Sequence, residues 1–194
     1  MPPFSIPPRC GNLVKSLSGR GFLVAIDHDG PMTTQVSTDL SFAASPDQVW
    51  QMLISPEYIA FKRAAQGALE FSMHSEADCT TLVFTRPISG ELPAGVSALL
   101  GSSAHIVETQ DWLPACADGS RAAELSIVVG QAPANIMGTA SLVPAAAGTR
   151  ITIELSISVS IPFFGGTAEQ MIKSELEKYI ESEQRLGADW LATK

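Results

Sequence analysis

The end of the chain carries the pattern that most narrows its possible folds: a regularly alternating strand followed by a long amphipathic helix. From Ile151 to Ile161 every second residue is aliphatic, and the residues between them are Thr, Glu or Ser, which is the period of a half-buried strand. Pro162 cannot donate to a strand ladder, so it ends the strand. Residues 167–191 then place apolar side chains on one stripe, in a helix of roughly 25 residues and about 37 Å. Such a helix is too long to cover only one end of a small sheet.

The preceding chain supplies the other strands of that sheet. Residues 36–42 alternate between apolar and polar side chains, and the sequence SPDQ at 45–48 predicts a helix with a capping box. A second Ser-Pro pair at 55–56 predicts another short helix, which stops near Gly67. Five further strands are expected at residues 69–73, 82–86, 102–113, 121–129 and 134–143. Residues 89–101 do not alternate and are expected to form a loop with one helical turn.

The terminal helix has its own start signal. Thr167 with Gln170 forms another capping box, and Glu169 stands four residues before Lys173, which favours an ion pair along the helix. We therefore expect the helix to begin at Thr167.

The predicted order is one strand, two helices, six strands and one long helix, an α+β arrangement. Consecutive strands joined by short turns form an antiparallel meander. Seven twisted strands curl, and a helix laid across the concave face closes the curled sheet. The cavity that such an arrangement often leaves is where we expect a ligand.

Residues 1–31 differ from the rest of the chain. They contain five prolines, and their longest apolar run, FLVAI at 22–26, is too short for a signal-peptide core or a membrane span. Met32 follows Pro31 and opens the first patterned strand. We expect a poorly ordered leader at 1–31, either native or an artefact of start-site assignment, and one domain at 32–194.

Charge and composition exclude several classes of function. The chain has 12 Lys and Arg against 20 Asp and Glu, a net charge of −8, which disfavours nucleic acid and anionic membrane surfaces. No run approaches the roughly 20 apolar residues of a membrane span. Three cysteines without a CxxC motif suit a reducing cytoplasm. Three histidines without a ligand-spaced cluster predict neither a metal site nor a cofactor.

Three stretches resemble a known superfamily. They are SPDQVWQMLISPEY at 45–58, QDW at 110–112, and ISVSIPFFGGTAEQMI at 157–172, which leads into a helix closing with Trp190. With the element order, they are similar to the START-like, or SRPBCC, helix-grip superfamily, and within it to the bacterial domain-of-unknown-function family 2505. The resemblance covers about residues 32–192. It implies a curled seven-stranded antiparallel sheet wrapped on the C-terminal helix, with a cavity for a hydrophobic ligand, and it implies no particular ligand.

The candidate ligand-binding residues are those that this topology turns toward the cavity. Arg86 and Gln110 could orient a polar group, His105 beside Val107 could contact a ligand, and the apolar residues of 96–100 could form a lid. The full set of candidates is Phe71, Phe84, Arg86, Val96, Leu99, Leu100, His105, Val107, Trp112, Ile153, Leu155, Phe164, Met171 and Tyr179. The strand positions depend on register, because a slip of one residue turns every side chain to the other face.

Three functions remain open at this point. The first is a non-catalytic carrier or sensor for a hydrophobic small molecule or lipid, which the absence of a readable catalytic constellation favours. The second is a protein-interaction module, with a protein partner. The third is a cyclase or hydrolase, which needs an inward acid or base, with His105, Arg86 and Glu124 as candidates. We expect a monomer or a weak homodimer.

Overall fold

The computed structural model describes residues 33–67, 69–76, 78–87, 105–161 and 165–194. The expectations for the leader at 1–31, the loop at 89–101 and the candidates Val96, Leu99, Leu100 and Phe164 lie outside the described residues.

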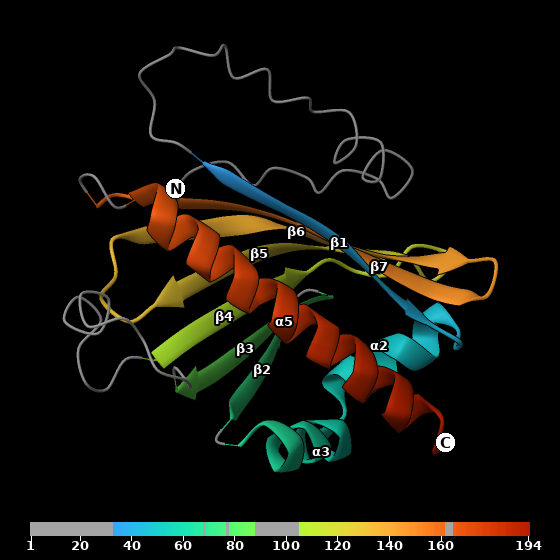
Figure 1. Cartoon of the computed structure of the whole chain (residues 1–194). Coiled ribbons are helices and arrows are strands. Elements are labelled where there is room, and N and C mark those ends of the chain that lie inside the picture. The colour runs from blue at the N-terminus through green and yellow to red at the C-terminus, as the bar shows by residue number, and fades with distance from the viewer. Residues whose placement is uncertain (1–32, 68, 77, 88–104, 162–164) are drawn as a thin grey trace. The chain divides into compact units, whose positions relative to one another are not determined.

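One antiparallel sheet of seven strands forms the body of this part of the chain, in the order β1-β7-β6-β5-β4-β3-β2 (Figure 1). The meander predicted from the alternating segments is confirmed, and the first strand joins it at the edge beside β7. The strands are β1 (Thr34–Phe42), β2 (Glu70–Glu76), β3 (Cys79–Pro87), β4 (His105–Trp112), β5 (Arg121–Val129), β6 (Ala134–Ala145) and β7 (Gly148–Val159).

Two short helices, α2 (Pro46–Ile54) and α3 (Pro56–Gln66), follow the first strand. The predicted capping box is present, because the Ser45 hydroxyl accepts from the Gln48 backbone N–H while the Gln48 side chain accepts from the Ser45 N–H. Gly67 ends α3 with a φ of 85°, a backbone conformation that favours glycine. Local sequence signals therefore set the bounds of both helices.

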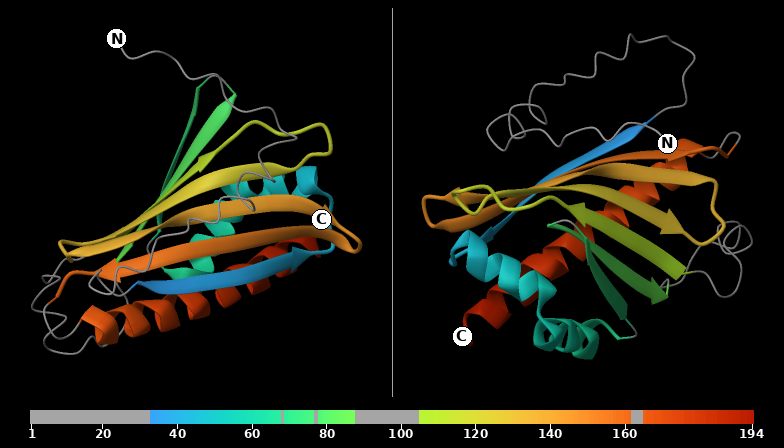
Figure 2. Two further views of the ribbon diagram at one scale, coloured as in Figure 1. Left: turned by 90° about the horizontal axis from the view of Figure 1, so that it is seen from above. Right: turned by 180° about the vertical axis from the view of Figure 1, so that it is seen from behind.

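The long helix α5 (Gly165–Leu191) crosses the inner face of the curled sheet, with α2 and α3 near its C-terminal half (Figures 1 and 2). Its 27 residues begin two positions before Thr167, so the prediction of Thr167 as its N-cap is wrong. Gln170 donates instead to the Thr34 hydroxyl of β1. The Gln184 side chain accepts from the backbone N–H of Ser41 and donates to its carbonyl, which ties the helix to the exposed edge of the sheet.

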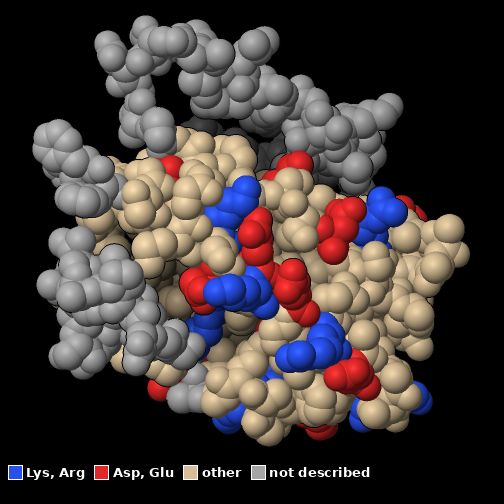
Figure 3. Space-filling view, viewed as in Figure 1, with Lys and Arg blue, Asp and Glu red and all other residues tan. Residues whose placement is uncertain are grey.

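Glu169 is a buried anchor rather than half of a pair with Lys173. Its carboxylate accepts from the backbone N–H of Val159 at 3.0 Å and from the Thr34 hydroxyl at 2.9 Å. Lys173 pairs with Glu177 one turn further along the helix. The expected pair fails because residue 169 lies on the side of α5 that faces the sheet, whereas the outer side of α5 carries interspersed acidic and basic side chains (Figure 3).

Candidate functional site

A cavity of about 90 Å³ lies between the inner face of the sheet and the helices. Most of its lining is aliphatic or aromatic, but six polar or ionisable side chains also reach it. The lining residues are Leu40, Leu53, Tyr58, Ile59, Lys62, Phe84, Glu108, Gln110, Trp112, Leu125, Ile127, Ala140, Ile151, Ile153, Leu155, Leu176, Tyr179, Ile180 and Glu183.

The size of the cavity limits what it can hold. It is smaller than an engineered dry cavity of about 150 Å³ that accepts benzene. It is far below the roughly 300–1,000 Å³ of pockets for drug-sized ligands. A ligand of a few heavy atoms fits the cavity as it stands, and a single ring requires small shifts of the lining side chains.

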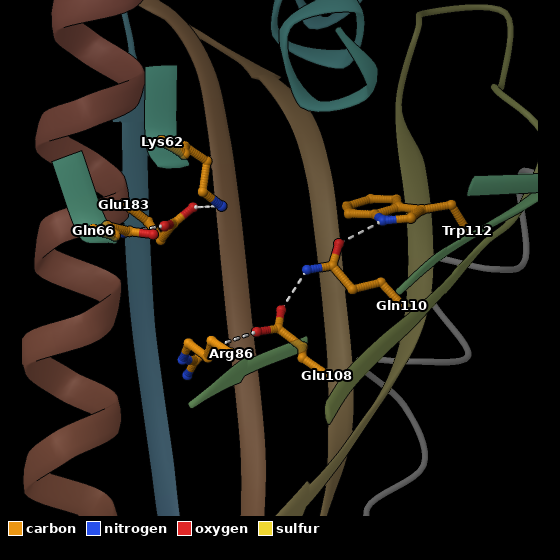
Figure 4. A network of polar contacts seen from close by, with 7 residues as sticks. All are labelled: Lys62, Gln66, Arg86, Glu108, Gln110, Trp112 and Glu183. Carbon is orange, nitrogen blue, oxygen red and sulfur yellow. Dashed lines mark hydrogen bonds and ion pairs between the residues drawn. The ribbon is translucent and has the colours of Figure 1, made fainter. Parts of the chain in front are cut away.

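A chain of polar contacts runs along β4 on the cavity side (Figure 4). The Trp112 indole N–H donates to Oε1 of Gln110 at 2.9 Å, and the Gln110 amide donates to Oε1 of Glu108 at 2.5 Å. Arg86, from the neighbouring strand β3, lies with Nη1 at 3.4 Å from Oε2 of Glu108. The Arg86 guanidinium also covers the Tyr179 ring of α5, at 3.8 Å from its centroid. Glu108, Gln110 and Trp112, spaced two apart on β4, thus place a carboxylate and an amide on the mainly apolar sheet side of the cavity, and Arg86 of β3 pairs with the carboxylate.

A second polar cluster joins α3 to α5 (Figure 4). The Lys62 ammonium donates to Oε2 of Glu183 at 2.6 Å, and the Gln66 amide donates to Oε1 of the same carboxylate at 2.8 Å. Lys62 Nζ also lies 4.7 Å from the centroid of the Phe84 ring. The Lys62 side chain is only 4% exposed, and a lysine so buried requires a partner of this kind.

Both tyrosines of the chain line the cavity, and their surroundings keep them protonated. Burial, followed by the nearby Glu183 and Glu108 carboxylates, raises the pKa of Tyr179 well above its ordinary value. Burial, followed by the Glu183 carboxylate, also raises the pKa of Tyr58. Each hydroxyl is therefore a neutral hydrogen-bonding group at physiological pH.

The structure places the described candidates from the sequence in three groups. Phe84, Trp112, Ile153, Leu155 and Tyr179 line the cavity.

Arg86 adjoins the lining through Glu108, and Phe71 packs on Phe84 with 5.1 Å between ring centroids. Met171 is half-buried on α5 and is not part of the lining.

His105 and Val107 lie on the opposite face of β4, so their expected inward direction is wrong. Their even-numbered neighbours Glu108, Gln110 and Trp112 line the cavity, and side chains of one strand alternate between faces. His105 is exposed, as is Glu124 on β5. The acids that do reach the cavity are Glu108 and Glu183.

Lys62, Glu108 and Glu183 are site residues that the sequence analysis missed. A signal for each was nevertheless present. Glu108 shares the two-residue period of Gln110 and Trp112, and Glu183 stands four residues after Tyr179 on the apolar stripe of α5. Lys62 stands four residues after the buried Tyr58 on α3. A charged residue that keeps the period of a buried face is a candidate for the interior.

The described part of the chain holds neither a metal-binding cluster nor a membrane-spanning helix. No group of three or more His, Cys, Asp or Glu side chains there could hold a metal ion. None of the described helices is long and apolar enough to cross a membrane.

Sequence comparisons find relatives whose functions are themselves unknown. A family model described as "Protein of unknown function (DUF2505)" matches residues 37–191. The uncharacterized protein Rv0481c of Mycobacterium tuberculosis (strain ATCC 25618 / H37Rv) is 32% identical over 105 residues, 53% of this chain and 60% of that protein. The uncharacterized protein Mb0491c of Mycobacterium bovis matches with the same figures. The match thus spans about three fifths of these relatives' length.

Solved structures share the fold at low identity. The Zhui aromatase/cyclase from Streptomyces sp. R1128 has a TM-score of 0.53 and 12% identity, covering 81% of this chain and 93% of that chain. Ara h 8.0201 has a TM-score of 0.53 and 8% identity, with coverages of 84% and 100%. Norcoclaurine synthase from Thalictrum flavum has a TM-score of 0.52 and 14% identity, with coverages of 91% and 96%. The START-like helix-grip fold expected from the sequence is therefore confirmed.

Proposed function

Because the chain belongs to the protein family of unknown function DUF2505, we propose its function from its own cavity: it binds a small, largely apolar molecule without transforming it. The observation that carries this proposal is a cavity of about 90 Å³ lined mainly by apolar side chains, with hydrogen-bonding groups held in its wall. Ligand sites in proteins have this composition, a mostly apolar lining with a few fixed polar groups.

The volume favours a ligand of about one ring or less over an acyl chain. A lipid tail would need several times the present space, and hydrogen bonds of Glu169 and Gln184 hold α5 against β1 and β7. We therefore propose the small-molecule form of the carrier or sensor hypothesis.

Non-catalytic binding is proposed because the charged groups of the cavity are engaged with one another. Glu183 accepts from both Lys62 and Gln66, and Glu108 accepts from both Arg86 and Gln110. A general base has to take a proton from its substrate, and a proton taken by either carboxylate would leave the buried Lys62 or Arg86 without its counter-charge.

A cavity-filling variant tests the proposal. Toluene and phenol are the probes, and thermal unfolding of the wild type and of Ala140→Leu is followed at increasing probe concentration. A probe at 100 times its Kd stabilises the folded state by about 2.7 kcal/mol, so the wild-type Tm should rise. Ala140 is in the lining, and its replacement by Leu should abolish the rise.

The variant should itself remain folded. Filling 90 Å³ of cavity recovers at most about 2 kcal/mol, at roughly 24 cal/mol per Å³, which offsets the strain of a larger side chain. Ser141→Leu, on the next residue of β6 and hence the opposite face, is the matched control and should respond to the probes like the wild type. Failure of both probes to stabilise the wild type would refute the proposed function, and an undiminished response of Ala140→Leu would place the site elsewhere.

A further inference from the structure

We infer that the cavity selects electrically neutral ligands that carry a hydroxyl or another uncharged hydrogen-bonding group, and that it rejects carboxylates and amines of the same size. This inference rests on the proposed function and specifies its ligand class. The observation behind it is the balance of charge at the cavity wall: the lining residues Lys62, Glu108 and Glu183, with Arg86 adjoining the lining behind Glu108, form two ion pairs.

Each charge of the wall already has its counter-charge. The Lys62 ammonium and a Glu183 oxygen are 2.6 Å apart, with the side chains 4% and 17% exposed. The Arg86 guanidinium and a Glu108 oxygen are 3.4 Å apart, and both side chains are mostly buried. The pairs come from four different elements, α3, α5, β3 and β4, so the fold itself brings the compensating charges together.

A charged ligand would find no free counter-charge here. Moving an ion out of water into an apolar site is costly unless the ion is paired. A carboxylate could approach Lys62 or Arg86 only in competition with Glu183 or Glu108, and it would lie close to those like charges. An ammonium ligand would meet the same difficulty with the signs reversed.

A neutral polar group, by contrast, can use the hydrogen-bonding capacity that remains. A carboxylate has about four lone-pair sites and an ammonium three donors. For the described residues, the structure records two hydrogen bonds to Glu183 and one from Lys62. A ligand hydroxyl can donate to a carboxylate oxygen or accept from the ammonium without breaking either pair. The ring of the ligand would then meet the aliphatic and aromatic remainder of the lining.

The test compares three one-ring probes that differ in charge: phenol, benzoate and benzylamine. Binding is followed by protein-observed NMR at neutral pH, with the indole N–H of Trp112 as the reporter, because Trp112 lines the cavity and donates to Gln110. Phenol should bind to the wild type at least about tenfold more tightly than either charged probe, because burying an unpaired charge costs more free energy than a tenfold difference in affinity represents.

Charge-changing variants make the test specific. Glu108→Gln and Glu183→Gln each leave one cation of the wall without its anion, so each should raise benzoate affinity relative to phenol about tenfold or more. Glu175→Gln is the matched control, because Glu175 also lies on α5 and its side chain is 68% exposed. It makes the same change in net charge and should leave the preference unchanged. Two cavity variants are used so that poor folding of one does not remove the test.

The outcomes separate the inference from the proposed function. Preference for phenol in the wild type, with benzoate gained in either cavity variant but not in Glu175→Gln, supports the inference. Binding of benzoate or benzylamine as tightly as phenol to the wild type would overturn the inference and leave the proposed function standing. An unchanged benzoate-to-phenol ratio in both cavity variants would also overturn it. Binding of none of the three probes would overturn the inference, and the proposed function falls with it only if toluene also fails to bind.

Discussion

Removing the buried lysine of the cavity wall is expected to destabilise the fold strongly. Lys62→Met replaces the ammonium with an apolar group of similar length and leaves the Glu183 carboxylate without its cation. The Lys62–Glu183 contact is 2.6 Å, with the lysine 4% exposed. Loss of one partner from a buried pair costs about 3–5 kcal/mol, and we expect Lys62→Met to fall in this range.

Removing both charges should restore most of that loss. The double variant Lys62→Met/Glu183→Leu replaces the pair with apolar side chains, an exchange that is often neutral or stabilising by about 1–4 kcal/mol. Lys178→Met is the control, since Lys178 and Glu175 lie 2.7 Å apart on α5 with side chains 66% and 68% exposed. An exposed pair of this kind contributes about 0.2–1 kcal/mol.

Urea unfolding followed by tryptophan fluorescence measures these differences. With an m-value of about 2 kcal/mol/M, Lys62→Met should lower the urea midpoint by roughly 1.5–2.5 M, while the control should lower it by about 0.5 M or less. The reasoning is refuted if Lys62→Met costs no more than Lys178→Met. It is equally refuted if the double variant is as unstable as the single one, because the cost would then not come from an uncompensated Glu183.

Three smaller predictions follow from the same contacts. The pKa values of Tyr58 and Tyr179 are raised, so absorbance at 295 nm should show no tyrosinate near pH 10 until the protein unfolds. Unfolded tyrosines release their protons there, so stability should fall above pH 10 by about 1.4 kcal/mol per pH unit for each tyrosine; native titration near pH 10 would contradict this. Gly187→Ala places a Cβ 2.6 Å from Phe42 Cε1, and an overpacking cost of about 1–3 kcal/mol should exceed the roughly 1 kcal/mol gain in helix propensity; a raised Tm would argue against it. Ser45→Ala should cost about 1 kcal/mol in urea unfolding through loss of the α2 cap, and an unchanged midpoint would show that the cap contributes nothing.

Local signals in the sequence were sufficient for most of the fold. The strand at 121–129 was predicted with the bounds that the structure has. The capping box at Ser45 and the stop at Gly67 also stand as predicted. These features depend on neighbours within a few residues, which a single sequence displays directly. The start of α5 could not be found in this way, because the side chains of its first turns bind partners outside the helix. Gln170 donates to the hydroxyl of Thr34 in a distant strand, and Glu169 accepts from the backbone N–H of Val159.

The polar wall of the cavity was the harder part to predict. Which side chains of β4 face the cavity depends on whether its odd or its even positions point inward. The candidates from the sequence included both kinds, His105 with Val107 and Gln110 with Trp112, and only the even positions line the cavity. A rule that assigns charged residues to the solvent-exposed face fails for a residue whose counter-charge comes from another helix or strand. Arg86 and Glu108 are 22 residues apart, and Lys62 and Glu183 are 121 apart. Only the folded topology reveals that these charges compensate each other.

The most direct measurement of the central claim is a set of isotope-filtered NOEs between phenol and the labelled protein. If phenol occupies the cavity, its ring protons should show NOEs to the methyl groups of Leu125 and Ile127 and to the indole of Trp112, three lining groups from β5 and β4. NOEs confined to exposed residues such as Met73 or Met137, at a phenol concentration that shifts the protein spectrum, would contradict the claim that this cavity is the binding site.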